Sequence, residues 1–126
     1  MIHLDASFLI PALNPGSKQD LWLREWIWQG VPLGMSSVSW TEFLCGPVKP
    51  DHVRLALDFL QAPLAYGPAD CALAARLFNE GGRRRGSLSD CMIAATAVRA
   101  QAALATSDLA GFRRFEPFGL KLAPRE

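Results

Sequence analysis

Short apolar runs alternate with longer stretches in which apolar residues recur every three or four positions. The short runs predict strands at Met1–Leu4, Leu33–Ser36, Leu64–Tyr66, Ala103–Thr106 and Leu120–Leu122. The longer stretches predict helices at Ala6–Leu13, from Ser17 to the stop at Gly30, and at Ser37–Cys45, Pro50–Gln61, Pro68–Glu80 and Ser87–Gln101, with a single turn at Asp108–Phe112. Strands that are apolar on both faces and alternate with helices are typical of an α/β sandwich around a mostly parallel sheet.

The composition indicates one ordinary globular domain over residues 1–126. Half of the residues are hydrophobic, and 13 basic against 12 acidic side chains leave a net charge of +1, which indicates no particular partner. The three cysteines are far apart and form no Cys-x-x-Cys pair, so we expect reduced thiols. The first residues do not resemble a signal peptide, and no apolar run is long enough for a membrane span. We therefore expect a soluble cytoplasmic protein.

Four acidic residues stand where predicted strands end and helices begin. Asp5 ends the first strand, Asp108 follows the strand that starts at Ala103, and Glu42 and Asp90 lie early in their helices. Chemistry in open parallel sheets gathers at these junctions. If the strands before Asp5 and Asp108 are parallel neighbours, both carboxylates emerge on one edge of the sheet.

Each of these acids also has a purely structural interpretation. Ser39 to Glu42 and Ser87 to Asp90 have the spacing of a capping box, and Asp5 and Asp108 could be simple helix N-caps. Four carboxylates at one edge would instead repel one another and raise each other's pKa unless a cation neutralised them. Oxygen ligands favour Mg²⁺ or Mn²⁺, and neither of the two histidines has the spacing of a zinc site.

The acidic segments resemble the motifs of a known family. The segments are Leu4–Ser7, Thr41–Glu42, Ser89–Ala97 and Thr106–Phe112. They are similar to the acidic motifs of PIN domains, and their order, spacing and Asp-x-x-Ile-Ala-Ala helix are most similar to VapC-type toxins of bacterial toxin–antitoxin pairs. The resemblance runs from Met1 to about Leu122 and implies a sheet of about five parallel strands flanked by helices.

The resemblance also implies an activity and partners. It implies a Mg²⁺- or Mn²⁺-dependent endoribonuclease, an antitoxin partner and a homodimer. Asp5, Glu42, Asp90 and Asp108 match the acidic positions, and Thr106 matches a hydroxyl position beside the site. Ala6 and Ser107 depart from the pattern, since Thr and Asn are frequent there, but neither departure removes a carboxylate. Bound divalent ions can activate water, polarise a phosphoryl group and stabilise the leaving oxygen, so we expect all four acids to hold the metal.

Basic and aromatic residues supply candidate binding surfaces. Arg83, Arg84 and Arg85 form a run between glycines shortly before Asp90 and could contact the RNA backbone, or they could be a solvated charge run at a helix end. The doublet at 113–114 is a similar, weaker candidate. Two tryptophans at 22 and 26 share a helical face that we expect to pack in the core, whereas Trp28 points elsewhere and could contact a protein.

Other functions remain as alternatives to the nuclease. A PIN-like module that binds RNA or protein without cutting would be favoured by a missing acid, and all four are present. A phosphohydrolase with an aspartyl nucleophile usually carries a second Asp two residues after the first, where this chain has Ser7. The sequence lacks the Gly-x-x-x-x-Gly-Lys-Ser/Thr motif of nucleotide-binding P-loops, and no cysteine has a histidine partner in its sequence context.

Overall fold

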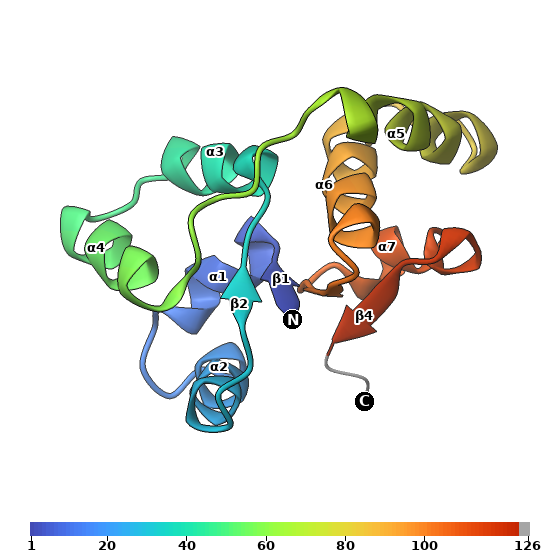
Figure 1. Cartoon of the computed structure of the whole chain (residues 1–126). Helices are drawn as coiled ribbons and strands as arrows, with labels where there is room; N and C mark the ends of the chain where they lie inside the picture. Colours follow the sequence, from blue (N-terminus) through green and yellow to red (C-terminus); the bar gives the residue numbers. More distant parts are fainter. Residues whose placement is uncertain (124–126) are drawn as a thin grey trace.

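The computed structural model describes residues 1–123, which form three layers (Figure 1). The described strands are β1 (Ile2–Leu4), β2 (Leu33–Gly34), β3 (Ala103–Ala105) and β4 (Lys121–Ala123). The described helices are α1 (Ala6–Ala12), α2 (Lys18–Trp28), α3 (Ser37–Cys45), α4 (Pro50–Phe59), α5 (Pro68–Glu80), α6 (Leu88–Arg99) and α7 (Leu109–Arg113), with a 3₁₀ turn η1 (Glu116–Phe118). The alternation of strands and helices predicted from the sequence is confirmed.

The sheet is entirely parallel, in the order β2-β1-β3-β4. The described residues form four strands, one fewer than the expected five. The missing strand is the predicted Leu64–Tyr66, which makes only an isolated bridge with Ser36. Pro63 precedes this segment and Gly67 and Pro68 follow it, so too few residues remain to extend the ladder.

Each face of the sheet has its own hydrophobic core. One core packs α1–α4 against the sheet and the other packs α5–α7 against the opposite face, as the two groups of helices show in Figure 1. Leu4 of β1 belongs to the first core and Leu104 of β3 to the second, because successive side chains of a strand point to opposite faces. Trp22 and Trp26 stack on Phe8 in the first core, as their shared helical face predicts.

The central strands end side by side. Leu4 of β1 is in register with Ala105 of β3, and the backbone N–H of Asp5 donates to the carbonyl of Ala105 at 2.8 Å. The strands β1 and β3 are therefore parallel neighbours that end at the same edge of the sheet, which is the condition under which the sequence analysis expected Asp5 and Asp108 to emerge together. None of the helices within residues 1–123 is long and apolar enough to cross a membrane.

Candidate active site

The four acids predicted from the sequence line one open cleft at this edge of the sheet. Asp5 follows β1, Glu42 comes from α3, Asp90 from the first turn of α6, and Asp108 precedes α7. Ala6, Ser7 and Phe112 complete the lining of a cavity of about 240 Å³. The structure thus brings together residues separated by more than a hundred positions of sequence.

Asp5 is the most enclosed of the four and is held by hydroxyl groups. Its Oδ2 atom accepts hydrogen bonds from Ser7 Oγ at 2.8 Å and from Thr106 Oγ1 at 2.9 Å. Asp5 occupies the N-cap position of α1, but its side chain makes no cap hydrogen bond. The two hydroxyl groups therefore orient this carboxylate toward the cleft, and the simple N-cap interpretation of Asp5 is wrong.

Asp108 is positioned by its own helix. Its Oδ1 atom accepts from the backbone N–H of Gly111 at 3.0 Å, so here the N-cap interpretation is confirmed. The backbone N–H of Asp108 donates to Thr106 Oγ1 at 3.0 Å. A β-carbon at position 111 would come within 2.3 Å of the Asp108 carboxylate and would force this side chain to shift. Thr106 thus connects the two acids that follow neighbouring strands.

The two remaining acids are not helix caps. Ser36, rather than Ser39, caps α3, so Glu42 lies beyond the first turn and the predicted capping box is wrong. Ser87 is the N-cap residue of α6, but it makes no side-chain cap bond in the structure. Asp90 therefore lies in a first helical turn, where the helix dipole favours an acid, without closing a capping box.

The negative charges of the cleft repel one another. Burial raises the pKa of Glu42, and the nearby carboxylates of Asp5 and Asp90 raise it further, against the opposing effect of a hydrogen bond with Ser89. Burial likewise raises the pKa of Asp90, and Asp5 and Asp108 add to this increase, while Arg114 opposes it. Repulsion of this kind is the condition that a bound cation relieves.

The donor set of the cleft fits a hard divalent cation. Four carboxylates offer only oxygen ligands, which Mg²⁺ and Mn²⁺ prefer. Within residues 1–123, no three His, Cys, Asp or Glu side chains lie close enough together to hold an ion as they stand. The side chains of Glu42 and Asp108 are exposed and that of Asp90 is half-buried, so burial does not prevent them from reorienting around an ion. The carboxylates that would hold an ion therefore line one cleft.

Two residues near the cleft have structural contacts that sequence analysis did not assign. Ser7 belongs to the first acidic segment and stands where an aspartyl-nucleophile enzyme usually has a second Asp, but the sequence analysis assigned it no contact; in the structure its hydroxyl holds Asp5. Its position two residues after an acid at a helix start was the available signal. Arg114 was grouped with Arg113 as a weak RNA contact, but its guanidinium lies over the Phe115 ring at 4.5 Å. Its Nε and Nη2 atoms are buried without a hydrogen-bond partner in the described part of the chain.

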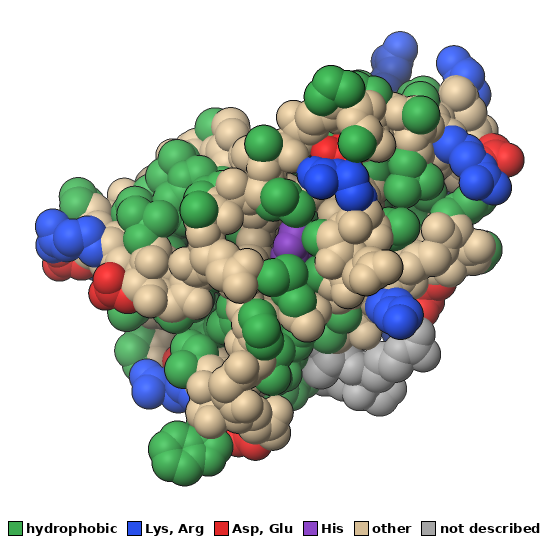
Figure 2. Space-filling view, in the orientation of Figure 1, with side chains coloured by type: hydrophobic (Ala, Val, Ile, Leu, Met, Phe, Trp, Pro, Cys, Tyr) green, Lys and Arg blue, Asp and Glu red, His purple; other side chains and the backbone are tan. Residues whose placement is uncertain are grey.

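The arginine run lies in the loop between α5 and α6. Arg83 adopts a left-handed backbone conformation and donates to Asn79 at 2.6 Å, with its guanidinium over Phe78. Arg84 and Arg85 are exposed. Blue side chains gather at the upper right of Figure 2, over the end of α5 that leads into this loop. The loop joins directly to the end of α6 that carries Asp90.

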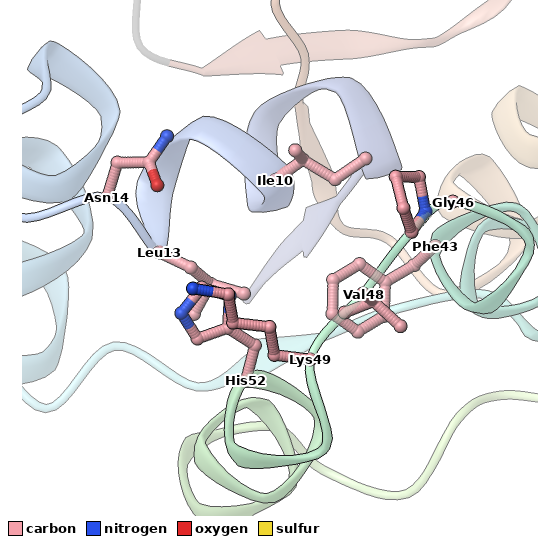
Figure 3. A pocket seen from close by; sticks show the side chains of 9 residues that line it. Ile10, Leu13, Asn14, Phe43, Gly46, Val48, Lys49 and His52 are labelled. Carbon is pink, nitrogen blue, oxygen red and sulfur yellow. The ribbon is translucent and has the colours of Figure 1, made fainter.

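A separate cavity of about 270 Å³ lies between α1, α3 and the start of α4. Figure 3 shows its lining, which includes Ile10 and Leu13 of α1, Phe43 of α3, and Val48 before α4. None of the four cleft acids lines it. Its apolar walls distinguish it from the carboxylate cleft.

The sequence was compared with protein-family profiles and with curated proteins. The sequence profile of the PIN domain matches residues 2–116. A comparison with curated protein sequences finds no significant match.

Several solved bacterial structures have a similar fold. The chain is similar to one in VapBC2 from Rickettsia felis bound to a promoter DNA fragment, with a TM-score of 0.77 and 19% identity over 100% of both chains. It is similar to VapBC-1 from nontypeable Haemophilus influenzae, with a TM-score of 0.72 and 24% identity over 97% of this chain and 96% of that one. It is also similar to a chain in a toxin–antitoxin complex from Klebsiella pneumoniae, with a TM-score of 0.71 and 22% identity over 89% of this chain and 90% of that one. The profile match and the shared fold show that the chain belongs to the PIN-domain family.

Proposed function

We propose that this protein is a divalent-metal-dependent endoribonuclease and the toxin of a cytoplasmic toxin–antitoxin pair. The observation that carries the proposal is the single cleft lined by Asp5, Glu42, Asp90 and Asp108, in which carboxylates raise each other's pKa. PIN-domain toxins are generally nucleases, and the structures with the same fold include toxin–antitoxin complexes.

The proposed mechanism assigns a task to each group. Bound Mg²⁺ or Mn²⁺ would supply an activated water and stabilise charge on the phosphoryl group and the leaving oxygen. Asp5 and Asp90 would bind the ion directly, with Asp108 and Glu42 completing the shell or holding its waters. The hydroxyl groups of Ser7 and Thr106 keep Asp5 oriented, so little rotational freedom is lost when an ion binds.

The proposal also names a substrate contact and protein partners. Arg83, Arg84 and Arg85 join the end of α6 that bears Asp90, which suits them to hold the RNA backbone. We propose an antitoxin as the protein partner, because the structural neighbours include toxin–antitoxin complexes. A homodimer is part of the same proposal and rests on the resemblance to VapC-type toxins.

The alternative is a PIN-like module that binds RNA or protein without cutting. Such a module has no need for four carboxylates on one cleft, where their repulsion destabilises the ionised protein. The complete acidic set therefore favours the nuclease over the binding module.

Cleavage of total RNA by the purified protein tests the proposal. We expect cuts at defined positions with Mg²⁺ or Mn²⁺ and none in EDTA, with the ends mapped by sequencing. Mg²⁺ should also stabilise the fold, by about 1.4 kcal/mol at tenfold its dissociation constant. Equal cleavage in EDTA would contradict the metal mechanism. Mg²⁺-dependent stabilisation without any cleavage would favour the binding module.

A further inference from the structure

A second pocket adjoins the carboxylate cleft on the side of α2. It encloses about 130 Å³ and lies between the start of α2, α1 and the loop after β3. Its lining residues are Phe8, Lys18, Gln19, Trp22, Thr106, Ser107 and Leu109. The pocket therefore combines aromatic rings, one cation, an amide and hydroxyl groups, and no acidic side chain lines it.

Hydrogen bonds connect this pocket to the cleft. Gln19 Nε2 donates to Ser107 Oγ at 3.3 Å, and Ser107 Oγ donates to the backbone carbonyl of Ser7 at 2.8 Å. The backbone N–H of Ser107 donates to Ser7 Oγ at 3.1 Å. Thr106 lines the pocket and also donates to Asp5 Oδ2. A group in the pocket would thus lie one side chain away from a carboxylate of the cleft.

The walls of the pocket have the chemistry that recognises a nucleobase. Trp22 is half-buried and stacks on Phe8, with 6.4 Å between ring centroids and 17° between planes, so its indole is held rigidly. Proteins bind unpaired bases by stacking them on aromatic side chains and by hydrogen bonds to the base edges. Gln19 offers an amide for such bonds, and its present bond to Ser107 is long and exposed.

Lys18 supplies the charge for the nucleotide backbone. Its ammonium group lies over the Trp22 ring at 4.9 Å from the centroid, and the residue is exposed. The long lysine side chain allows the ammonium to move from the ring to a phosphate oxygen and leave the indole to the base. A peptide segment would gain less from this arrangement, because the cation and the polar rim match a phosphate and a base edge.

We infer that this pocket binds one unpaired base of the RNA, next to the phosphodiester bond at the carboxylate cleft. The inference rests on the proposed ribonuclease function and adds a base-reading subsite to it. Because the pocket contacts one nucleotide, it would give a base preference at one position beside the cut.

Binding of short RNAs tests the subsite separately from cleavage. We would use the full chain with Asp90→Asn in Mg²⁺ and measure fluorescence anisotropy of labelled homohexamers of adenosine, cytidine, guanosine and uridine. A hexamer of abasic ribose phosphate carries the same charge without bases. At least one homohexamer should bind about tenfold more tightly than the abasic chain, the effect of stacking one base. Equal binding of all five chains, or no binding, would overturn the inference.

Substitutions then locate the effect. Adding Trp22→Leu or Gln19→Ala should remove most of the base-dependent gain, whereas Trp28→Leu, which removes an 86% exposed indole of the same helix, should keep it. Lys18→Gln should weaken the binding of all five hexamers and reduce the slope of log K against log salt by about 0.7. Gln19→Ala guards against a folding defect in Trp22→Leu. Loss of the gain in Trp28→Leu but not in the pocket variants would refute the subsite.

Cleavage by the protein with its natural Asp90 provides the second arm. Mapped cuts in a random-sequence RNA should show a base preference at one position beside the cut, and Trp22→Leu and Gln19→Ala should flatten it. Equal loss of cutting at all sequences would indicate a structural role only and count against the subsite. If the protein cuts no RNA but the hexamer results hold, the ribonuclease proposal fails and the base pocket stands.

Discussion

Two aspartates at the starts of neighbouring helices have opposite surroundings. Asp70 lies in the first turn of α5 and Asp90 in the first turn of α6, and these two helices pack together. Asp70 is fully buried and accepts bonds from Arg99 at 2.5 and 3.1 Å and from the backbone N–H of Gly67 at 3.0 Å. Asp90 instead faces other carboxylates in an open cleft.

The difference appears in the pKa values. Burial alone would raise the pKa of Asp70, but the bonds from Arg99 and Gly67 outweigh it, and the pKa is lowered. The pKa of Asp90 is raised by burial and by Asp5 and Asp108, and Arg114 does not compensate. A buried acid with its own cation serves the fold, whereas an acid among other acids makes sense when a ligand supplies the missing charge.

The largest expected effect is the loss of activity in Asp90→Asn. If Asp90 holds the metal, RNA cleavage should fall by about a thousandfold, because a metal ion contributes several kcal/mol to such a transition state. Thermal unfolding without metal should be unchanged or shifted upward, since one repelling charge is gone. The matched control is Asp58→Asn at an exposed position of α4, and this variant should cleave normally. Full activity in folded Asp90→Asn protein would remove Asp90 from the site.

The second effect is a loss of stability in Asp70→Asn. Breaking a fully buried ion pair costs about 3–5 kcal/mol. The Arg99 side chain is 37% exposed and can turn to solvent, so we expect a smaller loss. Urea unfolding should show a free energy of unfolding lowered by about 2 kcal/mol. Cleavage per folded molecule should be retained. Asp51→Asn, which breaks the exposed pair with Arg54, is the control and should change little. A loss of cleavage per folded molecule would mean that Asp70 also contributes to the carboxylate cleft.

A smaller effect, on RNA binding, is expected from an arginine in the loop between the same two helices. Arg99 is bound to Asp70, whereas Arg84 is exposed in the loop that joins α5 to α6. Arg84→Glu should weaken RNA binding several-fold and reduce its salt dependence, with no change in the melting temperature. Arg54→Glu on α4 carries the same charge change away from the cleft. Unchanged RNA affinity in Arg84→Glu would leave the loop as a solvated charge run.

The smallest effect is the pH dependence of stability without metal. Glu42 and Asp90 have raised pKa values in the folded state, so their contribution is present below the ordinary carboxyl range and is lost as the pH rises through their folded values. Asp70 has the opposite sign, with stability present above its ordinary pKa of 3.8 and lost as the pH falls. Urea unfolding over a pH series in EDTA should show the rising-pH loss diminished in Asp90→Asn. If the pH dependence of stability in Asp90→Asn equals that of the natural protein, Asp90 does not repel the other carboxylates of the cleft.

The helices were predictable because their signals are local. Pro68 opens α5 and Glu80 ends it at the predicted residues, since a proline at the start and glycines after the end are read directly from the chain. The strand predicted at Leu64–Tyr66 is absent from the sheet, and this could not be read from the sequence because its pairing depends on how far the edge strand β2 continues beside it. There the backbone of Tyr66 donates to the Ser37 hydroxyl rather than to a strand.

Periodicity and capping residues act over a few positions, so the alternation of strands and helices and the four acids near their junctions could be read from the sequence. Which acids cap a helix and which lie together in the cleft depends on how the chain folds in three dimensions. The tertiary structure also gave Ser7 and Thr106 their hold on Asp5 and joined the Trp22 pocket to the cleft. The bond from Thr106 to Asp5 joins residues 101 positions apart, and it exists only once β1 and β3 pair.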